Sequence, residues 1–186
     1  MKIAVFCGSS RGNDDGFAQA ARKFGRYTAS QGIDLVFGGG KVGLMGVIAD
    51  AVLEDGGKAY GVIPESLRDR ELAHNGLTRL DVVGSMHERK ALMADMADAF
   101  VALPGGPGTM DEIFEAWTWA QLGYHHKPCA LLNVNGYYDE LIAFFKTMAG
   151  SGFLKAEYAD MVIVEESAEA LIAALHNYQP RASKWG

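Results

Sequence analysis

Residues 99–120 read AFVALPGGPGTMDEIFEAWTWA, and this stretch decides the fold. Its first five residues form a short apolar run bounded by Pro-Gly, which is typical of a buried strand. The segment from residue 113 onward is long enough for a helix. Between them lies a glycine-rich segment, residues 103–108, which we call the glycine loop. Because open α/β sheets bind ligands at the carboxyl ends of their strands, the stretch predicts a binding site as well as a fold class.

Short apolar runs alternate with helix-length segments along the rest of the chain. Strands are predicted at residues 2–7, 33–37, 59–63, 81–83, 98–103, 129–133 and 161–164, and helices at residues 14–30, 44–55, 86–96, 110–122, 137–149 and 168–177. With right-handed crossovers, this alternation predicts an α/β fold: a Rossmann-like, doubly wound, mainly parallel sheet with helices on both faces. We expect a single nucleotide-binding domain over residues 1–186, with a flexible tail at residues 179–186.

The composition argues against several classes of protein. The chain has 186 residues, 49% of them hydrophobic, which is enough for a core without disulfides or metals. Its net charge is −6 and it has no run of lysines or arginines, which argues against nucleic-acid binding. No apolar stretch approaches the roughly 20 residues of a membrane span, and no signal-peptide pattern is present. Cys7 and Cys129 lie in predicted strands, so we expect two reduced, buried thiols in a cytoplasmic protein.

Four segments with unusual residues lie at predicted strand ends or helix starts. They are residues 7–10 (CGSS), residues 38–43 (GGGKVG), residues 85–90 (SMHERK) and the glycine loop. Because the carboxyl ends of parallel strands meet at one edge of a sheet, we expect these segments to form one site. This expectation places Ser9, Gly39 and Met86 among the substrate-binding residues.

The glycine loop predicts a phosphate cradle. Gly105, Gly106 and Gly108 permit backbone conformations that point successive amides into one concavity. We expect donors at the amides of Gly106, Gly108, Thr109 and Met110, aided by the positive end of the helix dipole. Thr109 is predicted to cap a helix that begins at Met110.

Glu112 admits a structural interpretation as well as a catalytic one. Residues 109–112 (TMDE) fit the S/T-x-x-E capping box, in which the glutamate only bonds back to the helix start. Ser85 and Glu88 have the same spacing, which makes Glu88 a poor catalytic candidate.

Arg89 and Lys90 occupy the first turn of a predicted helix, where the helix dipole disfavours cations by roughly 0.3–1 kcal/mol per charge. A nearby anion would offset this cost. The candidates are Glu112, a ligand phosphate, or both, and each would give the two cations a role in the site.

Residues 38–43 also match the dinucleotide fingerprint G-x-G-x-x-G, and Glu65 lies near the place of its acidic residue. The motif follows the second strand rather than the first, however, and its glycines equally permit a tight turn and close helix packing. His87, His125 and His126 show no metal-ligand spacing, so we expect no metal.

The joined motifs resemble the LOG family. Residues 104–112 (PGGPGTMDE), preceded by residues 86–90 (MHERK) and followed by residues 118–123 (TWAQLG), carry the likeness, which extends over about residues 2–164. Members are cytokinin riboside 5′-monophosphate phosphoribohydrolases, often mislabelled as lysine decarboxylases. They hydrolyse the N-glycosidic bond of a nucleoside 5′-monophosphate, release the base and ribose 5-phosphate, and form dimers on a Rossmann-like fold.

By this resemblance, Arg89 and Glu112 correspond to the catalytic pair of the family. The substrate-binding positions of the family correspond to Glu71, Lys90, residues 106–112 with Asp111 among them, and Thr118. The resemblance implies AMP, N6-prenyl-AMP or both as substrates, a homodimer, and no cofactor. Pro107 stands where the family commonly has an aromatic residue. Pyridoxal chemistry needs a Schiff-base lysine with a pyridinium partner, and the chain shows no such pattern.

Two questions stay open at this point. Glu112 can stabilise the positive charge that builds on the sugar, attack it, or activate water, and its position in sequence does not choose among these roles. A non-catalytic nucleotide or cofactor carrier on the same fold would keep the cradle without using the carboxylate.

Overall fold

The structure, a computed structural model, describes residues 1–68 and 73–181. Within these residues, seven strands form one sheet: β1 (Lys2–Phe6), β2 (Asp34–Phe37), β3 (Ala59–Pro64), β4 (Arg79–Val83), β5 (Ala99–Ala102), β6 (Cys129–Leu132) and β7 (Val162–Glu165). Their order is β4-β3-β2-β1-β5-β6-β7, and all six neighbouring pairs are parallel. The predicted α/β fold with a doubly wound parallel sheet is confirmed.

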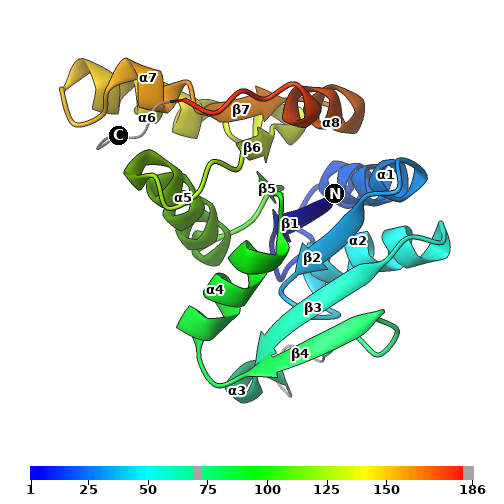
Figure 1. Cartoon of the computed structure of the whole chain (residues 1–186). Coiled ribbons are helices and arrows are strands. Elements are labelled where there is room, and N and C mark those ends of the chain that lie inside the picture. Colours follow the sequence, from blue (N-terminus) through cyan, green and yellow to red (C-terminus); the bar gives the residue numbers. More distant parts are fainter. Residues whose placement is uncertain (69–72, 182–186) are drawn as a thin grey trace.

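Helices cover both faces of the sheet. Over the same described residues they are α1 (Asp15–Ser30), α2 (Gly43–Glu54), α3 (Glu65–Arg68), α4 (Met86–Met96), α5 (Pro107–Leu122), α6 (Asp139–Gly150), α7 (Ala156–Ala159) and α8 (Ala168–His176), with a 3-10 turn, η1 (Val134–Gly136). Figure 1 shows α1, α2 and α8 on one face and α4, α5 and α6 on the other. The short elements α3, η1 and α7 were not predicted.

Each face of the sheet has its own apolar core. Along β1, Ile3 and Val5 belong to the cluster that packs against α1, α2 and α8, while Ala4 and Phe6 belong to the cluster on the α4 and α5 side. This alternation follows from the two-residue period of a strand. A strand buried on both faces must be apolar at every position, which explains the continuous apolar runs in the sequence.

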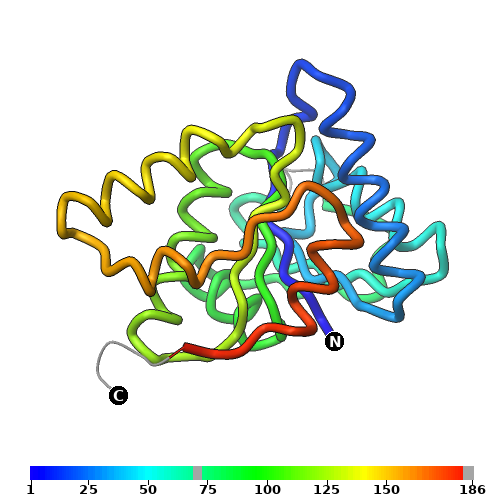
Figure 2. The backbone as a smooth tube through the Cα atoms, turned by 90° about the horizontal axis from the view of Figure 1, so that it is seen from above, coloured from blue at the N-terminus to red at the C-terminus, as the bar shows by residue number. Residues whose placement is uncertain are grey.

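The direction of winding reverses between β1 and β5. These strands are neighbours in the sheet, and Phe6 lies opposite Ala102 at their carboxyl ends. The loops that follow them are joined because the Gly8 N–H donates to the Pro104 carbonyl oxygen at 3.0 Å. Figure 2 shows β1 running through the middle of the molecule, with α1 on one side and α6 on the other. This switch point is the usual ligand site of such sheets.

Two predicted helix starts are wrong. Helix α5 begins at Pro107 instead of Met110, and α6 begins at Asp139 after η1, in which Asn135 has a left-handed φ of 53°. Residues 178–181 lie outside helices and strands, and the rest of the predicted tail lies outside the described residues. Within residues 1–68 and 73–181, every helix is too short or too polar to cross a bilayer.

Candidate active site

A pocket of about 280 Å³ opens at the switch point, where the loops after β1 and β5 meet α4 and α5. Eight of the predicted site residues line it: Ser9, Met86, Arg89, Gly106, Gly108, Thr109, Asp111 and Glu112. The remaining lining comes from Val5, Phe6, Cys7, Gly8, Gly38, Met45, Leu67 and Pro107. The pocket therefore brings together the four segments that the sequence placed at one edge of the sheet.

The start of α5 presents backbone amides to this pocket. Gly106 is the N-cap and Pro107 is the first helical residue, a position that suits proline because the missing N–H would have no helical acceptor. The predicted Thr109 cap is therefore wrong, and Thr109 lies buried inside the first turn. The Met110 N–H donates to the Gly106 carbonyl oxygen at 3.2 Å and is not a ligand donor. Pro107 has no N–H, so the helix-start amides without an intrahelical acceptor are those of Gly106, Gly108 and Thr109.

Of the three glycines of the loop, Gly105 alone is required by the space that the surrounding protein leaves. None of Gly105, Gly106 and Gly108 has a left-handed φ, so their backbone conformations do not by themselves require glycine. A Cβ on Gly105 would collide with the Thr109 side chain and lie 2.8 Å from the Gly8 nitrogen. A Cβ on Gly106 or Gly108 would meet nothing within 4 Å, although both residues line the pocket. Open space above helix-start amides is where a bound anion fits.

Glu112 lines the same pocket from the second turn of α5. Because the helix starts at Pro107, Thr109 is not its cap, and the capping-box explanation of Glu112 is wrong. The pKa of the buried Cys7 thiol is raised first by burial and then by the charge of Glu112. Cys7, which directly follows β1, and Glu112 line the same pocket at the switch point.

Arg89 is a buried cation in the pocket wall, with 6% of its surface exposed. Its Nη2 donates to the Gly38 carbonyl oxygen at 3.2 Å, and its Nη1 lies 3.7 Å from the Met86 Sδ. Gly38 has no room for a side chain, because a Cβ there would collide with Nη2. The guanidinium is thus fixed in the same pocket as the Glu112 carboxylate.

The start of α4 is capped as its sequence predicted, with one shift. The Ser85 Oγ accepts from the Glu88 N–H at 3.1 Å. The Glu88 carboxylate bonds back to the N–H of Gly84 at 2.8 Å rather than to that of Ser85. Glu88 therefore has a structural role.

Lys90 is directed at α5 and does not line the pocket. Its Nζ lies 3.2 Å from Asp111 Oδ2 and 3.0 Å from Glu115 Oε2. Burial opposes the charged form, yet the hydrogen bonds and charges of the two carboxylates outweigh it and raise the Lys90 pKa. The anions beside this cation are thus protein groups, and Lys90 holds the position of Asp111, which does line the pocket.

Four further predicted residues lie away from the pocket lining. Gly39 packs against Leu80 and Ile63, and Gly105 lines a neighbouring pocket of about 270 Å³. Met110 uses its amide within α5, and Thr118 is exposed on the same helix. Glu71 lies outside the described residues. Sequence reasoning missed Cys7 and Gly38 as lining residues, although both belong to motifs that it had singled out.

The glycines of residues 38–43 serve close packing. Gly43 has a φ of 61°, and a Cβ on it would collide with the backbone of Ser9. The N–H of Leu44, in the first turn of α2, donates to the Gly8 carbonyl oxygen at 3.0 Å. This geometry supports the packing interpretation of the motif over the dinucleotide fingerprint. Among the described residues, no three potential metal ligands come together.

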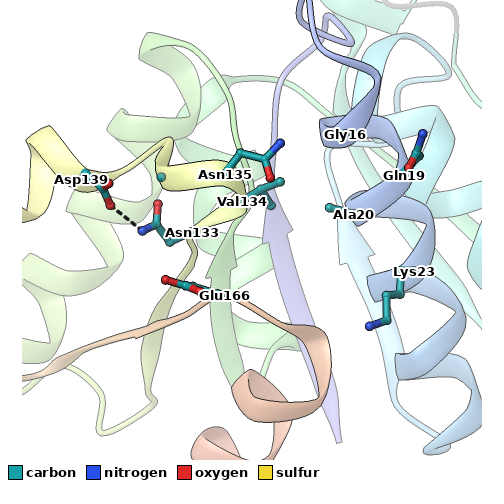
Figure 3. Close-up of a pocket in the computed structure, with 10 residues that line it drawn as sticks. Gly16, Gln19, Ala20, Lys23, Asn133, Val134, Asn135, Asp139 and Glu166 are labelled. Atoms are coloured by element: carbon teal, nitrogen blue, oxygen red, sulfur yellow. Dashed lines mark hydrogen bonds between the residues drawn. The ribbon is translucent and has the colours of Figure 1, made fainter.

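A larger cleft of about 650 Å³ lies between α1 and the segment after β6. Figure 3 shows Lys23 of α1 on one side of it and Asn133 and Glu166 on the other. The Asn133 side chain is bonded within the protein, because its Nδ2 donates to Asp139 Oδ1 at 2.7 Å. Since this cleft lacks the helix-start amides of α5, the switch-point pocket is the candidate active site.

Fold and pocket together define a doubly wound α/β protein with a helix start, a carboxylate and a guanidinium at its switch point. A family model described as "Possible lysine decarboxylase" matches residues 45–175. The probable cytokinin riboside 5′-monophosphate phosphoribohydrolase LOGL1 of Oryza sativa subsp. japonica is 48% identical over 177 residues, which cover 95% of this chain and 79% of that protein. The cytokinin riboside 5′-monophosphate phosphoribohydrolase of Rhodococcoides fascians is 48% identical over 176 residues, covering 94% and 89%. The chain belongs to the LOG family.

Solved structures show the same fold at lower identity. The molybdenum cofactor carrier protein of Chlamydomonas reinhardtii superposes with a TM-score of 0.72 at 24% identity, over 95% of this chain and 96% of that chain. The molybdenum cofactor binding protein of Rippkaea orientalis gives 0.72 at 22% identity, over 95% of each chain. At such identities the likeness concerns the fold alone. It therefore does not favour a cofactor carrier over an enzyme.

Proposed function

We propose that the chain is a phosphoribohydrolase that cleaves the N-glycosidic bond of a nucleoside 5′-monophosphate and releases the free base and ribose 5-phosphate. One observation carries this proposal: a carboxylate, Glu112, lies in the same pocket as open helix-start amides that fit a phosphate. The names of relatives that are 48% identical over nearly the whole chain describe this reaction.

The proposed chemistry follows from the arrangement of the pocket. The amides of Gly106, Gly108 and Thr109, at the positive end of the α5 dipole, would hold the phosphate. With the phosphate fixed, the ribose extends along the helix toward Glu112, which is catalysis by positioning. As the C1′–N bond breaks, positive charge builds on the sugar, and the carboxylate stabilises it or activates the attacking water. Water adds its hydroxide to C1′, and its proton leaves with the base.

Arg89 is the second proposed catalytic residue. A buried guanidinium fixed on the Gly38 carbonyl supplies a preorganised positive charge that orients the carboxylate or contacts the substrate. Pyridoxal-dependent decarboxylation has no support, since it needs a Schiff-base lysine. Lys90, the lysine nearest to the pocket wall on α4, is engaged by two carboxylates.

The substrate class that we propose is AMP or its N6-prenylated form. Apolar side chains of Phe6, Met45, Leu67 and Met86 line the pocket and suit a base with or without an apolar tail. The test is chromatography of the base released from AMP and from N6-isopentenyl-AMP. Release of either base supports the hydrolase, and a strong preference for the prenylated nucleotide indicates cytokinin activation. Tight AMP binding without release of adenine would indicate a carrier instead.

Further parts of the proposal concern assembly and compartment. Two large exposed side chains, Met86 of α4 and Phe144 of α6, support a homodimer, which sedimentation analysis can test. The two buried cysteines are free, which fits a reducing compartment such as the cytoplasm.

A further inference from the structure

Two consecutive tyrosines reach the glycine loop from the segment after β6. The Tyr138 hydroxyl donates to the Leu103 carbonyl oxygen at 2.7 Å, and the Tyr137 hydroxyl donates to the Gly105 carbonyl oxygen at 2.7 Å. Both bonds bridge more than 30 residues of sequence. The glycine loop, which joins β5 to α5, is therefore also held by a separate segment, the one that follows β6.

The other carbonyls of the loop are also bonded. Pro104 accepts from the Gly8 N–H at 3.0 Å, and the Gly106 carbonyl accepts from the first turn of α5 at 3.2 Å. In a trans peptide the C=O and the next N–H point in opposite directions. The bond from Tyr137 to Gly105 consequently sets the direction of the Gly106 N–H. Gly106 lines the candidate active site, whereas Tyr137 lies on the other side of the loop, in the neighbouring pocket.

The tyrosine segment is itself anchored. Asn133 accepts the Tyr138 N–H at 2.8 Å and donates to Asp139 at 2.7 Å, the bond drawn in Figure 3. Asn135 donates its side-chain N–H to Asp14, at the start of α1, at 3.1 Å. Burial foremost raises the Tyr138 pKa, so its phenol keeps the proton that it donates. The segment is a fixed support for the loop.

We propose that Tyr137 and Tyr138 are positioning residues that hold the glycine loop in its phosphate-binding shape. This inference rests on the proposed function, because it assigns to the loop the phosphate of the substrate. Neither hydroxyl lines the active-site pocket, so both act through the loop backbone. A looser loop weakens phosphate binding equally in the ground state and in the transition state, which raises KM and leaves kcat unchanged.

The experiment removes each hydroxyl alone, in Tyr137→Phe and Tyr138→Phe. Its matched control is Tyr124→Phe, at a tyrosine that is 76% exposed after α5 and distant from the loop in sequence. Calorimetry measures the Kd of ribose 5-phosphate, and steady-state assays measure KM and kcat for AMP. We expect Tyr137→Phe to raise both the Kd and KM by about 2- to 10-fold, the range for one hydrogen bond, with kcat within about 2-fold. Tyr124→Phe should equal the wild type.

The outcomes separate this inference from the proposed function. If wild-type protein binds ribose 5-phosphate and cleaves AMP, an unchanged Kd in Tyr137→Phe overturns the positioning role alone. A loss of kcat with an unchanged KM also overturns it. If the wild type neither binds ribose 5-phosphate nor cleaves AMP, the proposed function fails and this inference fails with it. Should Tyr138→Phe not fold, the half-exposed Tyr137 decides the result.

Discussion

A methyl group added to Gly108 should weaken substrate binding while leaving the fold intact or slightly more stable. Gly108 is in the first turn of α5, lines the pocket, and has no atom within 4 Å of where a Cβ would be. Gly→Ala at a compatible position stabilises a protein by about 0.4–1 kcal/mol, which for a chain of this size raises Tm by roughly 1–4 °C. The added methyl group would therefore displace only a ligand that is bound to the Gly108 amide.

The expected functional loss follows from the bond that the methyl group prevents. One hydrogen bond to a charged group contributes about 1.5–3 kcal/mol, so Gly108→Ala should raise KM for AMP by roughly 10- to 150-fold. Gly150→Ala is the matched control, because Gly150 is also helical with open space around its Cα, yet lies at the end of α6. The assay combines thermal unfolding with release of adenine from AMP. A Gly108→Ala variant with an unchanged KM would refute the assignment of the phosphate to these amides.

Three further outcomes are expected. Burial raises the pKa of Cys7, and of Cys129 to about 12, so neither thiol should react with an aromatic disulfide reagent until the protein is unfolded; rapid labelling of folded protein would contradict this. Burial lowers the pKa of His125 below 6.5, so the unfolded state binds more protons and stability falls with falling pH. Replacing His125 by Gln should therefore reduce the loss of unfolding free energy between about pH 7.5 and about pH 5.5, and an equal loss in both proteins would refute it. Gly38→Ala should displace the Arg89 guanidinium and lower kcat for AMP by at least about 10-fold with the fold retained; full activity would show that the position of Arg89 is not needed.

The sequence predicted the sheet well because a buried parallel strand has a distinctive composition. All seven strands were found within a few residues, since most of them are short apolar runs between polar breaks. Short elements such as α3 and η1 escaped because one turn is too little for a helical period. The start of α6 was misplaced because Asn135 takes a left-handed conformation, which leaves no periodic pattern.

The site could be located from sequence, but its internal geometry could not. The start of α5 was misread because Thr109 looked like a cap, whereas Pro107 was the better signal for the first helical position. The anion beside Lys90 was sought in Glu112 or a ligand phosphate, although Asp111 and Glu115 on the next helix supply it. Which of two adjacent cations points into a pocket depends on the packing of α4 against α5. Spacing along the sequence does not encode that packing.

The role of Glu112 is the central claim, and the Glu112→Gln variant tests it most directly. The change keeps the size of the side chain and removes its charge, and the N-cap of α5 is Gly106 rather than Thr109. Release of adenine from AMP, measured by chromatography under saturating substrate, should fall by at least about 100-fold, as expected when acid–base or charge-stabilising function is lost. Thermal stability and ribose 5-phosphate binding should stay close to those of the wild type. Turnover within a few-fold of the wild type would contradict the account.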